Sequence, residues 1–200
     1  MAFPAGAASR GRCLLLALAV IAAPAFAATT APVGAPEATL REDLQGARWP
    51  ADIVRTATHY LTAQPYGPAS EAARSELDRA RSTMRLLERS DIRLYRADFA
   101  GAGAVVPQIA DDVRKAALAD KEAALRVAHH HRDRAVDARS DGIHYIGWLQ
   151  YSAALGNAAG SYELALHYRK DNQPALAAPY EARAEELGFK IPTTLDNVRK

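Results

Sequence analysis

Cysteine is almost missing from this chain: its 200 residues include one, Cys13. We expect that residue to be removed with the N-terminal segment described below, which leaves a chain without thiols. A disulfide framework and any metal site that needs several cysteine ligands are therefore excluded. The fold must depend on its apolar core, and the chain is long enough to enclose one of ordinary size.

Net charge is also nearly absent. The formal charge is +2 at pH 7, and Arg10 and Arg12 account for it because residues 1–27 contain no acidic side chain. The rest of the chain is neutral. A neutral chain has no sequence-wide attraction to phosphate groups, so we expect no nucleic-acid partner.

Long hydrophobic runs are limited to one, over residues 14–23. Two arginines precede it, and Ala25-Phe26-Ala27 follows it with the small-x-small pattern of a cleavage site. The run is shorter than the roughly 20 apolar residues that span a bilayer. We predict a secretory signal peptide over residues 1–27, and hence an exported protein, periplasmic or secreted, with no transmembrane segment after cleavage. An uncleaved anchor is the alternative. A lipoprotein is disfavoured because Cys13 opens the apolar run instead of closing it.

The N-terminal half is predicted to contain a leader followed by a helical hairpin. Residues 28–47, rich in Ala, Thr, Pro and Gly, predict a flexible leader. The hairpin is predicted over residues 48–99: Pro50 begins its first helix, and apolar residues at helical spacing continue its second helix from Ser70, as N-cap, to Phe99. The outer face of the second helix alternates in charge, which is typical of a solvated surface. An arginine-rich recognition face is the alternative.

A second helical region follows the hairpin. Gly101 to Pro107 predicts a linker, and residues 107–190 then alternate helix and turn without a strand pattern. Asp120 and Asn157 are predicted N-caps, and residues 191–200 form a polar tail. The predicted helices of this region span 108–118, 121–132, 143–155, 158–169 and 175–187.

An internal repeat lies within this second region. Residues 116–132 return as residues 153–169 at a constant offset of 37. A period of this size is typical of stacked helical pairs, each of which buries its apolar face against a neighbour. In each unit a small residue precedes a ring, and a large ring precedes a glycine that ends a helix. The residues predicted to pack the repeats are Ala128, His131, Trp148, Gly156, Ala165, Tyr168, Tyr180 and Gly188.

Residues 162–168 (Tyr-Glu-Leu-Ala-Leu-His-Tyr) and 148–156 (Trp-Leu-Gln-Tyr-Ser-Ala-Ala-Leu-Gly) relate this repeat to a known pattern. The region from 108 to 190 resembles the Sel-like repeats, a tetratricopeptide-like family of paired antiparallel helices, with Ala128 and Ala165 in place of the family's glycine. The resemblance implies an all-α fold of helix hairpins stacked as a short right-handed α-solenoid. It also implies scaffold or adaptor work through protein contacts, often in bacterial envelope processes.

Two motifs were weighed for chemistry. Residues 129–133 (His-His-His-Arg-Asp) contain metal-ligating types, but consecutive helical side chains point about 100° apart and cannot converge on one ion, so no metal and no cofactor are predicted. Gly147-Trp148-Leu149-Gln150 is similar to the Gly-Leu-Met-Gln of periplasmic lytic transglycosylases, whose catalytic acid is a glutamate that precedes a serine. Here Arg139 precedes Ser140 and cannot protonate a glycosidic oxygen, so no catalytic residues are predicted.

The predicted function is the binding of another protein or a peptide. Arg126 and Glu163 occupy equivalent positions in adjacent units, as do His130 and His167, so stacking brings each pair into register. We predict these four residues as the partner-binding surface of an exported scaffold; that they are only solvated is the alternative. Two other classes stay open: a cell-wall glycosidase or accessory hydrolase, and a structural module of a larger envelope complex.

Overall fold

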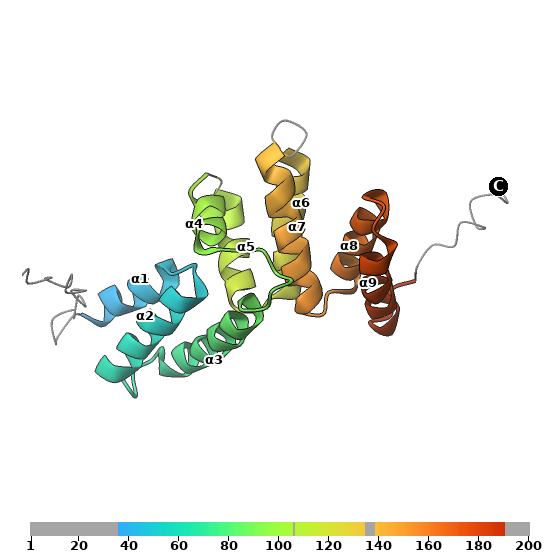
Figure 1. Cartoon of the computed structure of the whole chain (residues 1–200). Helices are drawn as coiled ribbons and strands as arrows, with labels where there is room; N and C mark the ends of the chain where they lie inside the picture. The colour runs from blue at the N-terminus through green and yellow to red at the C-terminus, as the bar shows by residue number, and fades with distance from the viewer. Residues whose placement is uncertain (1–35, 106, 135–138, 191–200) are drawn as a thin grey trace, which may run out of the picture. The chain divides into compact units, whose positions relative to one another are not determined.

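The computed structural model describes residues 36–105, 107–134 and 139–190 (Figure 1). Within these ranges the backbone forms nine α-helices and no strand, which confirms the all-α prediction. Residues 1–27, predicted as a signal peptide, and the tail 191–200 lie outside the described residues. The helices are α1 (Glu37–Gly46), α2 (Pro50–Ala63), α3 (Ser70–Leu87), α4 (Arg96–Val105), α5 (Pro107–Ala117), α6 (Lys121–Arg134), α7 (Arg139–Ala154), α8 (Ala158–Lys170) and α9 (Pro174–Glu186).

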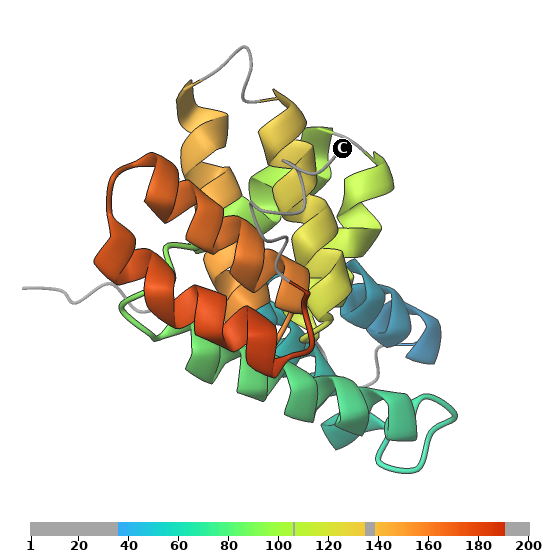
Figure 2. The same ribbon diagram turned by 90° about the vertical axis from the view of Figure 1, so that its right-hand side faces the viewer.

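Helices that follow one another in the chain pack against one another. α2 lies on α3, α4 on α5, α6 on α7 and α8 on α9, while α5 also contacts α6 and α7 also contacts α8. Figures 1 and 2 show the last pair, α8 and α9, side by side at the red end of the described chain. All nine helices belong to one compact unit.

The helix boundaries from residue 107 onward follow local signals in the sequence. Asp120 caps α6, since its Oδ1 accepts hydrogen bonds from the backbone N–H of Glu122 (3.0 Å) and Ala123 (2.9 Å). Asn157 caps α8 in the same way, with its Oδ1 2.8 Å from the N–H of Gly160. Gly156 and Gly188 follow α7 and α9 with φ of 84° and 86°, a left-handed conformation that glycine adopts without strain.

The flexible leader predicted over residues 28–47 is wrong for its second part, because residues 37–46 form α1. Leu40 and Leu44 stand four residues apart, so they share one face of the helix, and both are buried against the core. The Tyr60 hydroxyl of α2 also donates to Glu37 at 3.2 Å. Two leucines at helical spacing are sufficient here because α2 provides the surface that they cover.

The predicted second helix of the hairpin is too long. α3 ends at Leu87, residues 88–95 form an irregular segment, and α4 then begins at Arg96 and packs on α5. Ser70 is not an N-cap: it is the first residue of α3, and its hydroxyl donates to the Gln64 carbonyl at 2.7 Å. The predicted linker from residue 101 to 107 is helical through Val105, so glycine spacing alone overestimated the break.

A group of buried rings joins α2, α4 and α7. The fully buried Phe99 of α4 has its ring centroid 5.1 Å from Trp49, 4.9 Å from Trp148 and 6.4 Å from Tyr151. The Tyr151 hydroxyl donates to the Ala116 carbonyl of α5 at 2.7 Å, so this ring group also reaches α5. Edge-on and tilted ring pairs at these separations add to the stabilisation from area burial.

The irregular segment 88–95 runs directly against α7. Ile92 and Leu94 are buried, and the Arg93 backbone N–H donates to Oε1 of Gln150 at 3.1 Å. At the point of closest approach α7 has Gly147: a Cβ placed there would lie 2.5 Å from the Arg93 carbonyl oxygen. The absence of a side chain at this position therefore lets the segment lie on the helix.

Replacing Gly147 by alanine tests this contact. We expect Gly147→Ala to lower the free energy of unfolding by about 1–3 kcal/mol, because the clash is with backbone, which cannot rotate away. Gly142→Ala in the same helix meets no atom within 4 Å and should raise that free energy by about 0.5–1 kcal/mol, the usual gain for alanine over glycine in a helix. Urea unfolding of the two variants checks both signs; equal effects would contradict the assigned contact.

Candidate functional site

The residues predicted to pack the repeats fall into two groups. Ala128, Ala165 and Trp148 are fully buried, whereas Tyr168 and Tyr180 are half-buried. Trp148 contacts Phe99 of α4 and Tyr151, while Tyr180 of α9 stacks on Tyr168 of α8 with centroids 5.7 Å apart. The two large rings that precede Gly156 and Gly188 thus have different surroundings.

His131, the counterpart of Tyr168, is buried on α6. Its ring lies 5.3 Å from the ring of His144 on α7, as Tyr168 faces Tyr180 on α9. In both units the ring of the first helix therefore meets a ring on its partner helix. His144 in turn bonds through Nδ1 to the buried carboxylate of Asp98, which links α7 to the first turn of α4.

The structure places Arg126 against the preceding helix. Its Nη2 lies 2.6 Å and its Nε 3.1 Å from Oδ1 of Asp112 on α5. The hydrogen bonds from Asp112 raise the pKa of Arg126. The guanidinium is held in an ion pair between α5 and α6, although half of the side chain is exposed.

Glu163 is also engaged with preceding helices. Its carboxylate oxygens lie 2.9 and 3.0 Å from Nε2 of His129 on α6, and it accepts a hydrogen bond of 3.3 Å from the Tyr145 hydroxyl of α7. Arg132 of α6 adds a longer ion pair at 3.7 Å. Glu163 therefore joins α8 to both helices of the previous pair.

The two predicted histidines have local partners. His167 pairs with Asp171 one turn later on α8 at 3.3 Å, and the ring of His130 lies edge-on to that of His131. Together with the ion pairs of Arg126 and Glu163, these contacts account for the predicted binding residues as groups that hold neighbouring elements. They converge on no common pocket in the described part of the chain.

The Glu163 contacts predict a measurable contribution to stability. Glu163→Gln should lower the free energy of unfolding by about 1 kcal/mol, because the amide cannot form the charged hydrogen bonds with His129 and Arg132. Glu185→Gln, at an exposed site on α9, removes the same charge and is the matched control. Equal stability of the two variants in urea unfolding would show that Glu163 does not hold α8 to α6.

Tyr145 predicts a pH dependence above neutrality. Burial and the Glu163 carboxylate raise its pKa to about 12, above the ordinary value of about 10. Between these pH values the unfolded chain loses a proton that the folded chain keeps, so the free energy of unfolding falls as the pH rises. We expect a shallower fall for Tyr145→Phe, measured by urea unfolding from pH 9 to 12. Tyr66→Phe, at a fully exposed ring, should not change the slope.

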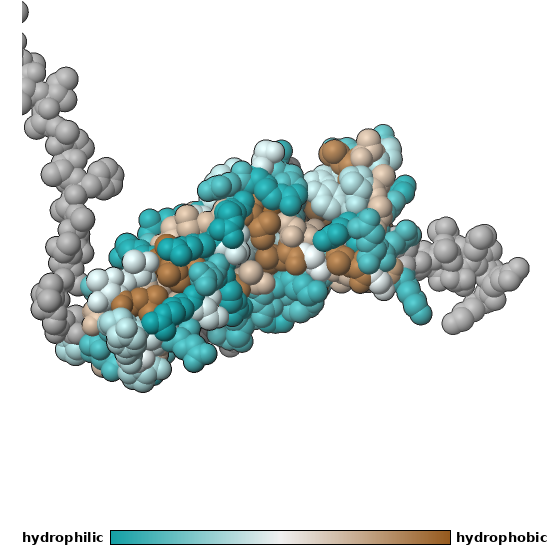
Figure 3. Space-filling model, turned by 90° about the horizontal axis from the view of Figure 1, so that it is seen from below, coloured by the Kyte–Doolittle hydropathy of each residue, from teal (hydrophilic) through white to brown (hydrophobic). Residues whose placement is uncertain are grey.

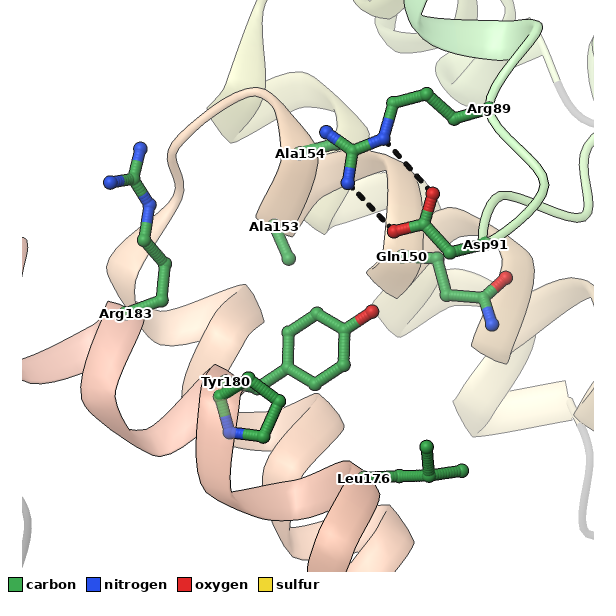
Figure 4. A pocket seen from close by; sticks show the side chains of 9 residues that line it. Arg89, Asp91, Gln150, Ala153, Ala154, Leu176, Tyr180 and Arg183 are labelled. Carbon is green, nitrogen blue, oxygen red and sulfur yellow. Dashed lines mark hydrogen bonds and ion pairs between the residues drawn. The ribbon is translucent and has the colours of Figure 1, made fainter.

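A pocket of about 480 Å³ opens between α7, α9 and the segment 88–95 (Figure 4). Its floor is apolar and its rim is polar. Figure 4 shows the Tyr180 ring in the middle, with the Arg89–Asp91 pair on one side and Arg183 on the other. The lining residues are Arg89, Asp91, Gln150, Ala153, Ala154, Leu176, Pro179, Tyr180 and Arg183.

The polar rim of this pocket is ordered by internal contacts. Nε and Nη2 of Arg89 donate to the two carboxylate oxygens of Asp91 at 2.9 and 2.7 Å, and these hydrogen bonds lower the pKa of Asp91. Burial raises the pKa of Tyr180, so its hydroxyl stays protonated at neutral pH. Gln150 is fixed at both ends, by the Arg93 N–H and by the Tyr168 hydroxyl at 3.2 Å.

This pocket was missed in the sequence because its walls are distant in the chain. Of its lining, only Tyr180 was selected beforehand, and for packing. Leu176 gave a weak signal, as a large aliphatic residue between two prolines. On the face of the molecule in Figure 3, hydrophobic residues gather in small patches separated by hydrophilic ones. A small site is therefore in keeping with the rest of that surface.

Two further observations concern the described residues. No three His, Cys, Asp or Glu side chains come together in them as metal ligands would. None of the described helices combines the length and the hydropathy that crossing a bilayer requires.

Comparison of the chain with protein-family models, with curated proteins and with solved structures gives no match.

Proposed function

We propose that this protein is an exported helical-repeat scaffold or adaptor of the bacterial envelope that binds another protein through an extended peptide segment. The pocket between α7, α9 and the segment 88–95 is its binding site. It replaces the four residues first predicted, which are engaged in contacts between helices. The sequence features of a signal peptide over residues 1–27 support export.

In this proposal the pairs α6–α7 and α8–α9 are consecutive units of a short right-handed α-solenoid. The starts of the two first helices meet, since Nδ2 of Asn157 donates to the Lys121 carbonyl at 3.3 Å. One to three turns later the same two helices meet again through His129 and Glu163. Two contacts in the same chain direction support parallel stacking of equivalent helices, as repeat proteins require.

The observation that carries the function is the composition of the pocket. Leu176, Pro179 and two alanines offer an aliphatic floor, and Leu176 is 50 % exposed, which a core residue of that size is not. The surrounding guanidinium, carboxylate and phenol groups can hold a polar main chain in position. Concave apolar sites with a few fixed polar groups are typical of ligand binding.

A charge on the floor tests the proposal. A random peptide library displayed on phage is selected against the mature protein, and the affinities of the selected peptides are measured by fluorescence polarisation. We expect Leu176→Asp to raise Kd at least about tenfold, because it puts a charge where an apolar side chain binds. Leu166→Asp on α8, which is 46 % exposed and outside the pocket, is the matched control and should leave Kd unchanged.

Two results would count against this site. Selected peptides that bind both variants as they bind the wild type would place binding elsewhere on the protein. Failure to select any peptide would reject the peptide-binding function.

A further inference from the structure

The guanidinium of Arg89 is held rigidly at the rim of the pocket. Asp91 takes two of its donors in a bidentate pair, which fixes the plane of the group and leaves Nη1 with its N–H bonds outside that pair. Figure 4 shows the guanidinium above the Tyr180 ring, on the α7 side of the pocket. An arginine that is already ordered loses little conformational freedom when it binds a ligand.

Arg183 supplies a second cation on the opposite wall. It stands on α9 one turn after Tyr180, and Figure 4 shows it across the ring from Arg89. Its partner is Glu186 at 3.3 Å, an exposed i,i+3 pair that a ligand can replace at little energetic loss. Two arginines and one carboxylate thus line the pocket, which leaves its rim positively charged.

We propose that the pocket selects acidic peptide segments, in which an Asp or Glu side chain lies beside an aliphatic residue. The carboxylate accepts hydrogen bonds from Arg89 Nη1 and from Arg183, and the aliphatic residue packs on Leu176, Pro179 and the Tyr180 ring. This inference rests on the proposed peptide-binding function and specifies its partner. Asp91 disfavours the opposite choice, because it is occupied by Arg89 and offers no free carboxylate to a basic ligand.

Matched peptides test the charge preference. Short synthetic peptides on an array share a leucine and differ at the neighbouring position, which carries Glu, Gln or Lys. We expect the Glu members to bind the wild-type protein at least about tenfold more tightly than their Gln counterparts, and the Lys members not to bind. The preference should weaken as salt is raised, because the two arginines are near solvent. A peptide with a C-terminal carboxylate and no acidic side chain separates the two sources of a carboxylate and should bind like the Gln members.

Variants identify the cations responsible. Arg183→Gln and Arg89→Gln should each reduce the preference for Glu over Gln by severalfold or more. Arg81→Gln is the matched control: Arg81 is 53 % exposed and belongs to an i,i+3 pair with Asp78 on α3, as Arg183 is 51 % exposed and pairs with Glu186. It should leave the preference intact. Circular dichroism of each variant confirms that the helices are retained.

The outcomes separate this inference from the function on which it rests. Equal binding of Glu and Gln members, or tighter binding of Lys members, would overturn the acidic preference while peptide binding stands. Loss of the preference in Arg81→Gln as well would overturn the assignment to this pocket. Binding of no member would reject both proposals.

Discussion

The Phe99 ring is the contact on which the arrangement of this protein depends. It lies between Trp49 at the start of α2 and the rings of Trp148 and Tyr151 on α7, and it is fully buried. Residues far apart in the chain are thus joined by one side chain. The bond between Asp98 and His144 repeats this link one residue earlier on α4. Because α4 is anchored twice to α7, the segment that precedes α4 has little freedom.

That restriction produces the pocket. The segment 88–95 must pass α7 before α4 begins, and Gly147 allows its backbone to touch the helix at Arg93. Arg89 and Asp91 are then held beside Gln150 and opposite Tyr180, where they form one rim of the pocket. The polar groups are ordered without a ligand, so binding does not have to order them first. Recognition in this account is a property of how an irregular segment crosses a helix.

The sequence predicted local features well and distant contacts poorly. From residue 107 onward the helices, the caps at Asp120 and Asn157 and the turn at Gly156 depend on neighbours within a few residues, and the structure confirms them. Helix α1 was missed because Leu40 and Leu44 are a weak pattern until α2 covers them. The pocket was missed for the same reason, as Arg89 and Tyr180 come together only through the fold. Equivalence along the repeat identified Glu163 but could not show that His129 occupies it.

Amide exchange at Arg93 tests the central claim directly. This amide lies outside the helices and donates to Gln150, so its protection reports whether the segment 88–95 is bound to α7. Hydrogen exchange by NMR in Phe99→Leu, compared with the wild type under native conditions, measures the dependence. The account predicts that the Arg93 amide exchanges at least about tenfold faster in the variant, because loosening of the ring contact releases the segment. Unchanged protection of Arg93 in Phe99→Leu would contradict it.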